Sequence, residues 1–113
     1  MIGLDREENK MNQIQRIETM EKNLDLTQQA IQKLSVAFEA YEQVQDAYKA
    51  LSDYYESAQW MQDFEDDEAG KLPKDLKRGV LSEDAVYDIM TENHDLMLRM
   101  LKVITRAFED KML

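Results

Sequence analysis

No glycine or proline occurs between Gly3 and Gly70, and this gap limits how the first half of the chain can fold. Tight turns depend on these residues, so a hairpin within the gap lacks obvious turn chemistry. Apolar residues recur there in steps of three and four, with one step of seven, which is the helical period. The stripe comprises Ile14, Ile17, Met20, Leu24, Ile31, Leu34, Phe38, Tyr41, Val44, Tyr48, Leu51 and Tyr55. The sequence therefore predicts a long amphipathic helix over about residues 10–55 with a coiled-coil-like seam.

The best candidate for a break in this helix is the segment 23–27, whose Asn23, Asp25 and Thr27 could cap a new helix. The stripe keeps its phase across the segment. We therefore favour one long helix and keep a kink or fold-back near residue 25 as the alternative. Residues 1–9 are charged and weakly patterned, and we expect them to be a frayed lead-in.

Two short helices are predicted in the middle of the chain. Ser57 is typical of an N-cap for a helix over about 58–68, and Gly70 suits its C-terminal end. That helix ends in acidic residues, which is unfavourable at a C-terminus, so positive charge should lie nearby. Pro73 and Gly79 bracket a second short helix over about 73–78.

Ser82 marks the clearest helix start, because a serine cap is followed by Glu83 and Asp84 in the first turn. A C-terminal helix over about 83–110 follows, and apolar residues cover much of its circumference. We predict an all-α single domain over residues 1–113, packed as an antiparallel helical bundle. At about 1.5 Å per residue the long helix spans roughly 70 Å and the last one roughly 40 Å. A fold-back near residue 25 or a second subunit must cover the excess, and we favour a homodimer.

Composition narrows the classes of function. The net charge of −10 disfavours nucleic acid and anionic membranes as partners, while a basic or neutral protein partner remains open. The chain has no cysteine, no apolar run of membrane-spanning length and no recognisable signal peptide. We therefore expect a cytoplasmic protein that binds no nucleic acid and no membrane.

The segment 54–90, which we call the corner, holds the only tryptophan and the only proline. Its sequence resembles the bacterial family catalogued as domain of unknown function 4298. The matching residues are Tyr54-Tyr55, Ser57, Trp60, Asp63, Asp67-Glu68, Gly70, Leu72-Pro73, Asp75-Leu76-Lys77-Arg78-Gly79-Val80-Leu81-Ser82-Glu83-Asp84 and Val86-Tyr87-Asp88, with a weaker match at Arg16-Ile17-Glu18 and Met20-Glu21. The resemblance implies a small, cytoplasmic, largely helical bacterial protein, and it supplies no activity, cofactor or catalytic residue.

The residues that could bind a metal ion or take part in catalysis have simpler explanations. The acidic run 63–68 fails as a calcium loop, because Glu68 stands where glycine is required and Lys74 where a bidentate carboxylate is required. These acids are expected to pair with the nearby lysines and Arg78. His94, the only histidine, lacks the residues that follow a phosphorelay histidine, and with no cysteine it does not suggest zinc. We predict no cofactor and no metal.

The leading hypothesis is a non-enzymatic interaction or structural module that self-associates as a dimer and presents an ordered corner. The alternative is a metal-dependent hydrolase, similar to nucleotide pyrophosphatases, which would use acid pairs one helical turn apart. Those pairs are Glu18 with Glu21, Glu39 with Glu42, and Glu92 with Asp95. The candidate functional or structural residues of the corner are Tyr54, Tyr55, Trp60, Asp63, Asp67, Glu68, Asp75, Lys77, Arg78, Ser82, Glu83, Asp84 and Tyr87.

Overall fold

The computed structural model describes residues 2–113, with side chains described from residue 6 onward. The elements are α1 (Ile2–Gln43), α2 (Gln45–Tyr55), α3 (Ala58–Glu68), the 3₁₀ helix η1 (Gly79–Leu81) and α4 (Glu83–Glu109). The predicted all-α class is confirmed. Contacts divide the chain between Asp46 and Ala47 into two units, while the single domain stays a prediction. Over residues 2–113, no helix combines the length and apolarity needed to cross a lipid bilayer.

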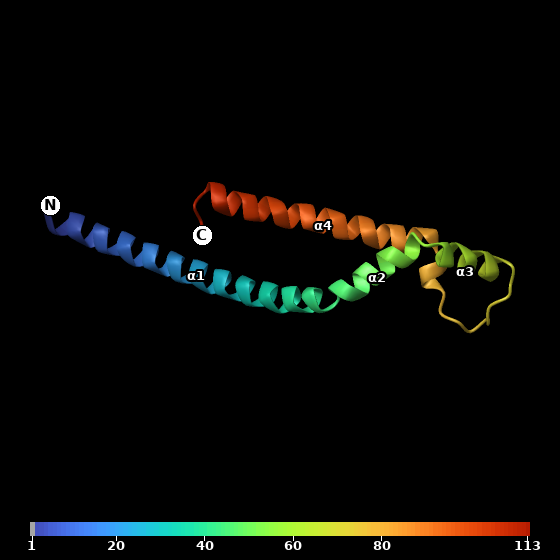
Figure 1. Ribbon diagram of the computed structural model, residues 1–113. Helices are drawn as coiled ribbons and strands as arrows, with labels where there is room; N and C mark the ends of the chain where they lie inside the picture. Colours follow the sequence, from blue (N-terminus) through green and yellow to red (C-terminus); the bar gives the residue numbers. More distant parts are fainter. Residues whose placement is uncertain (1) are drawn as a thin grey trace. The chain divides into compact units, whose positions relative to one another are not determined.

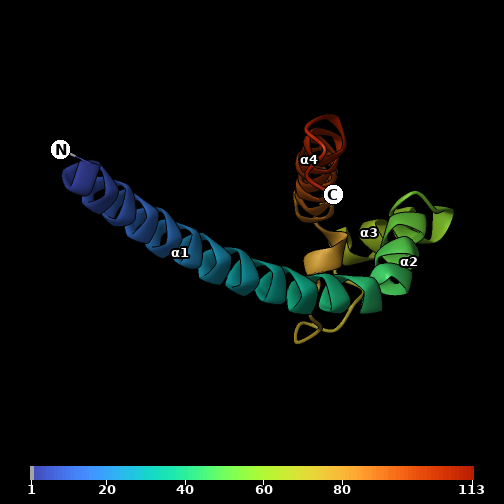
Figure 2. The ribbon, with the colours of Figure 1, turned by 90° about the vertical axis from the view of Figure 1, so that its left-hand side faces the viewer.

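The helix α1 runs unbroken through residue 25, so the fold-back predicted as an alternative there is wrong (Figure 1). It includes most of the expected frayed segment, apart from Met1, which lies outside the described residues. The break falls instead at Val44, and the long helix predicted over 10–55 becomes two. The Val44 amide donates to the carbonyl oxygen of Tyr41 at 3.2 Å, a tight i→i−3 bond that ends α1. Figure 2 shows the same uninterrupted course of α1 from a second side.

The apolar stripe of α1 is exposed. Every described side chain from residue 6 to residue 40 is in the exposed class. Ile17 is 52% exposed, Leu24 58% and Ile31 62%. Because α1 contains no reversal, its own residues cannot cover the stripe. The predicted bundle is therefore wrong as a description of the packing of a single chain, since bundle packing requires these positions to be buried.

The unit from Ala47 onward has its core in the corner. Among the residues whose burial is described, only Trp60, Leu81 and Val86 are buried. They come from α3, η1 and the first turn of α4, so the short elements enclose one small core. Beyond Val86, no residue of α4 is in the buried class, and Val103 and Phe108 are 70% and 69% exposed. The broad apolar circumference predicted for this helix is thus present but uncovered.

The helix predicted over 73–78 is also wrong. This segment has one hydrogen-bonded turn, in which the Leu76 amide donates to the carbonyl oxygen of Pro73 at 3.2 Å. The guanidinium of Arg78 donates to the same carbonyl. That side-chain bond competes with the i→i−4 bond that a helix would make there, because the amide of Lys77 would need the same acceptor. Helical structure resumes only at η1, with Arg78 as its N-terminal flanking residue.

Candidate functional site

Two serine caps define the helices of the corner. The Oγ of Ser57 accepts from the Trp60 amide at 3.2 Å and donates to the carbonyl oxygen of Tyr54 at 2.6 Å. The Oγ of Ser82 accepts from the Ala85 amide at 3.3 Å. The two bonds that the serine oxygens accept each satisfy an amide that a helix N-terminus leaves without an intrahelical partner. Both predicted caps are confirmed, and they fix where α3 and α4 begin.

Trp60 joins the elements of the corner. Its indole Nε1 donates to the carbonyl oxygen of Val80 at 2.9 Å, which ties α3 to η1. Its ring stacks on Phe64, with centroids 5.3 Å apart, and meets the edge of Tyr55 at 5.1 Å. The ring is 5% exposed. Trp60 therefore anchors α3 to η1, and its buried N–H has the partner that burial requires.

Tyr54 makes the second link between α2 and α3. Its hydroxyl donates to a carboxylate oxygen of Asp63 at 2.5 Å. This hydrogen bond, together with burial and the negative charge of Asp63, raises the pKa of Tyr54 to about 12. The carboxylate raises this pKa in two ways, because ionising the phenol would remove the donated proton and would also place two negative charges side by side.

The acidic end of α3 is closed as predicted. Gly70 has a φ of 73°, the left-handed region that a side chain disfavours. The Gly70 amide donates to the carbonyl oxygen of Asp67, and the Lys71 amide to that of Asp66, at 3.0 and 2.9 Å. This pair of bonds is the Schellman motif. The ammonium of Lys71 also lies 3.8 Å from the Asp66 carboxylate, so positive charge stands at the negative helix end.

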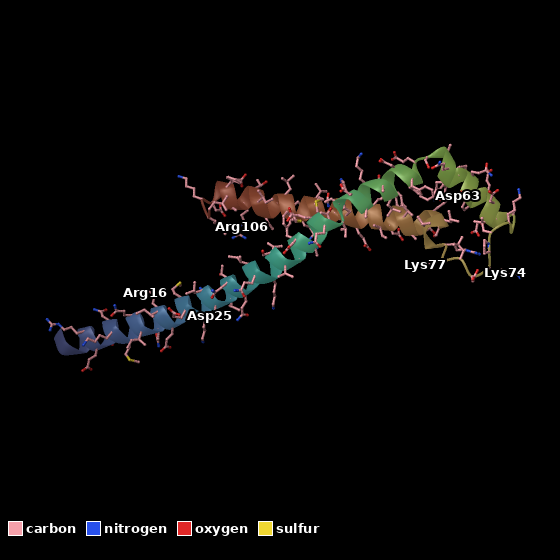
Figure 3. All side chains as sticks on the ribbon, turned by 60° about the horizontal axis from the view of Figure 1, so that its bottom comes forward. Arg16, Asp25, Asp63, Lys74, Lys77 and Arg106 are labelled. Atoms are coloured by element: carbon pink, nitrogen blue, oxygen red, sulfur yellow. The ribbon has the colours of Figure 1, made fainter. Side chains whose placement is uncertain are left out.

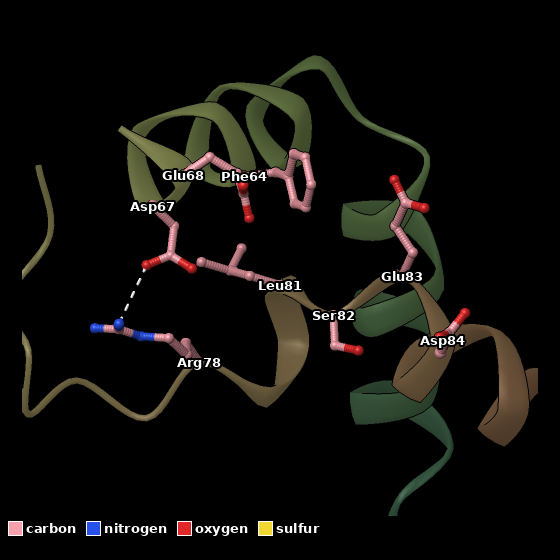
Figure 4. A pocket seen from close by; sticks show the side chains of 8 residues that line it. All are labelled: Phe64, Asp67, Glu68, Arg78, Leu81, Ser82, Glu83 and Asp84. Carbon is pink, nitrogen blue, oxygen red and sulfur yellow. Dashed lines mark ion pairs between the residues drawn. The ribbon is translucent and has the colours of Figure 1, made fainter. Parts of the chain in front are cut away.

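Arg78 supplies the second positive group at this helix end. Its guanidinium lies 3.4 Å from the Asp67 carboxylate and also donates to the carbonyl oxygen of Pro73. Its Nε is buried without a hydrogen-bond partner. The ion pair lies beside an open hollow, whose lining side chains Figure 4 shows. The volume of the hollow is about 420 Å³. The hollow is lined by Phe64, Asp67, Glu68, Arg78, Leu81, Ser82, Glu83 and Asp84.

Not all the predicted corner residues converge. Asp75 and Lys77 are exposed on the loop after α3, and among the described residues neither they nor Lys74 pairs with the acidic run (Figure 3). Tyr87 is 63% exposed. It lines a separate hollow of about 410 Å³ between the end of α2 and α4, together with Tyr55, Glu56, Met90, Thr91 and His94.

The hydrolase hypothesis finds no support in this geometry. Across the described part of the chain, no three histidine, cysteine, aspartate or glutamate residues are grouped so that they could hold a metal ion. Glu39 and Glu42 are exposed on α1, and Glu92 and Asp95 are exposed on α4. His94 is exposed too, with Nδ1 3.6 Å from the Asp95 carboxylate, a contact that carries charge only when the imidazole is protonated.

Sequence reasoning missed two residues of the corner. Phe64 stacks on Trp60 and lines the larger hollow, although it was absent from the candidate residues of the corner. The i, i+4 spacing of the two rings on one helix was the available signal. Val80 contributes only its backbone carbonyl to Trp60, and no side-chain pattern can announce such a role.

The comparisons with known proteins agree with the resemblance in the sequence. No curated protein and no solved structure matches the chain. The model of one family, described as a domain of unknown function (DUF4298), matches residues 17–103. The matched range covers most of the chain, including the whole corner, α2 and all of α1 from Ile17 onward. The chain therefore belongs to the DUF4298 family.

Proposed function

We propose that this protein is a non-enzymatic helical interaction module that self-associates through α1 and holds the corner as a fixed surface for a further protein. The observation that carries the proposal is the exposed stripe of α1. From Ile14 to Phe38 its large apolar side chains recur at helical spacing, yet each is 45–62% exposed in the single chain. A contiguous apolar surface of this kind on a soluble protein marks an interaction site.

A second copy of the chain fits this surface. The stripe lies along one uninterrupted helix, and an apolar seam with steps of three and four suits pairing with another helix of the same pattern. The corner needs no partner for its own order, because its caps, its ion pairs and the Trp60 hydrogen bond all lie within one chain. We therefore assign self-association to α1 and the binding of a further protein to the corner.

Two leucines on α1 provide a matched test. Leu24 is on the stripe and 58% exposed, while Leu26 is off the stripe and 65% exposed. In sedimentation equilibrium, the unmodified chain should show twice its 13.3 kDa mass at micromolar concentrations. Leu24→Glu should return it to the monomer mass, because a charge in a desolvated seam is costly. Leu26→Glu should leave the dimer intact.

Two results would count against self-association. One is a monomer mass for the unmodified chain at every concentration, which would leave the stripe to another protein or to another part of the same chain. The other is an equal loss of mass in both leucine variants, because the stripe would then have no special role. Circular dichroism of each variant shows whether its helix content is unchanged.

A further inference from the structure

The stripe of α1 has a strict heptad register in its central part. Ile17, Leu24, Ile31 and Phe38 stand seven residues apart, at the positions conventionally called a. Met20, Thr27 and Leu34 stand at the d positions, three residues after each of the first three. Structurally, all of them lie within one unbroken helix. One of these heptads, with Ile31 at a and Leu34 at d, has the pattern of parallel two-stranded coiled coils.

The charges beside the seam distinguish the two directions in which two copies could pair. Arg16 lies just before the first a residue, at position g, and Glu21 lies just after the first d residue, at position e. In a parallel, in-register pair, g of one helix faces the following e of the other. Arg16 of each copy then meets Glu21 of the second copy. Farther along, the same positions hold Asn23, Gln28, Ala30 and Ser35, which bring no like charges together.

The antiparallel arrangement lacks this match. The antiparallel alignment that pairs the most seam positions sets Met20 against Phe38 of the second copy and Leu24 against its Leu34. In this alignment the e positions of the two copies lie beside each other, and so do the g positions. Glu21 therefore approaches Glu42 of the second copy, and Arg16 lies beside Ala37 of the second copy. Like charges flanking a seam disfavour the pairing. The apolar register alone permits both directions, and the charges favour only one.

We propose that two copies of α1 form a parallel, in-register coiled coil over residues 16–38, with Arg16 of each copy paired to Glu21 of the other. This inference rests on the proposed self-association and specifies its geometry. In such a dimer both corners follow the same end of the coiled coil in sequence.

Disulfide trapping tests the direction, because the chain contains no native cysteine. In the full chain, Met20→Cys should form a disulfide dimer under mild oxidation, since a d residue faces its own counterpart in a parallel pair. The control Leu26→Cys, off the seam, should stay monomeric on non-reducing gels. A mixture of Met20→Cys and Phe38→Cys chains should give no disulfide between the two variants.

The outcomes separate the two proposals. A disulfide between Met20→Cys and Phe38→Cys chains, without a Met20→Cys homodimer, overturns the parallel geometry and leaves self-association standing. A dimer mass with no trapping in either experiment also overturns it, because Met20 then does not face its own counterpart. A monomer mass for the unmodified chain overturns the proposed self-association itself.

A charge reversal gives an independent readout. Arg16→Glu should weaken dimerisation on the order of ten-fold at low salt, because two attractive pairs become two repulsive ones. Adding Glu21→Arg to that variant should restore the affinity, and the weakening should fade at high salt. If the double variant stays as weak as Arg16→Glu alone, the proposed pairing between the two positions is wrong.

Discussion

Replacing Leu81 by alanine should strongly destabilise the corner. Leu81 is 7% exposed and is one of three buried residues in the part of the chain whose burial is described. Large-to-small changes of this kind cost roughly 2–5 kcal/mol. The lower half of that range fits here, because a small core with an open hollow beside it can relax. A unit that runs from Ala47 to Leu113 has a total stability of roughly 3–10 kcal/mol. The substitution should therefore remove a large share of it.

The fluorescence of Trp60 measures this effect directly. It is the only tryptophan and lies in the same core, so its emission reports on the corner and not on α1. In urea, the midpoint of the emission change should fall by roughly 2 M for Leu81→Ala, given a slope of about 1 kcal/mol per M. Leu76→Ala is the matched control, because Leu76 lies on the neighbouring loop and is 46% exposed. Equal midpoints for the two variants, or solvent-exposed emission in the unmodified chain, would refute the reasoning.

Two further substitutions test the links around this core. The pKa of Tyr54 in the folded chain, about 12, lies above its ordinary value near 10. The stability that the hydrogen bond from Tyr54 to Asp63 supplies is therefore complete below pH ~10 and is lost as the pH rises toward 12. Chemical denaturation at both ends of this window should therefore show a smaller loss of stability for Tyr54→Phe than for the unmodified chain, and an equal loss would show that Asp63 does not hold the phenol. Gly70→Ala should cost about 1 kcal/mol in the same measurement, because its φ is positive even though an added Cβ would meet no atom within 4 Å. Gly79→Ala, which has the same open space without a positive φ, should change stability by less than about 0.5 kcal/mol, and similar losses for both glycines would contradict this explanation.

Local signals in the sequence predicted the corner well. Ser57 and Ser82 cap the helices that begin immediately after them, and Gly70 takes the left-handed conformation expected of it. These features depend on a few neighbouring residues, so the sequence contains what decides them. The failed helix over 73–78 depended on a contact from farther away, since Arg78 bonds both Pro73 and Asp67. Its proline and glycine are consistent with a helix but do not require one.

The break at Val44 had only an ambiguous signal. The stripe takes two successive steps of three there, from Phe38 to Tyr41 to Val44, and such a shortened spacing favours local overwinding. The tight bond that ends α1 agrees with that tendency. However, Ile14, Ile17 and Met20 show the same spacing within an unbroken part of α1. The spacing alone therefore does not locate a break. No local sequence pattern predicts whether the stripe is covered, because that depends on which surface packs against it.

The hydrogen bond from Trp60 to Val80 also bears on how the chain acquires its structure. It joins residues only 20 positions apart, and the other links of the corner span shorter distances in sequence. Closing so short a loop has a small entropic cost, and chains dominated by near-neighbour contacts fold within microseconds to milliseconds. Translation adds only about 5–20 residues per second. The corner can therefore form as soon as its own residues are clear of the ribosome, in less time than translation takes to add one residue.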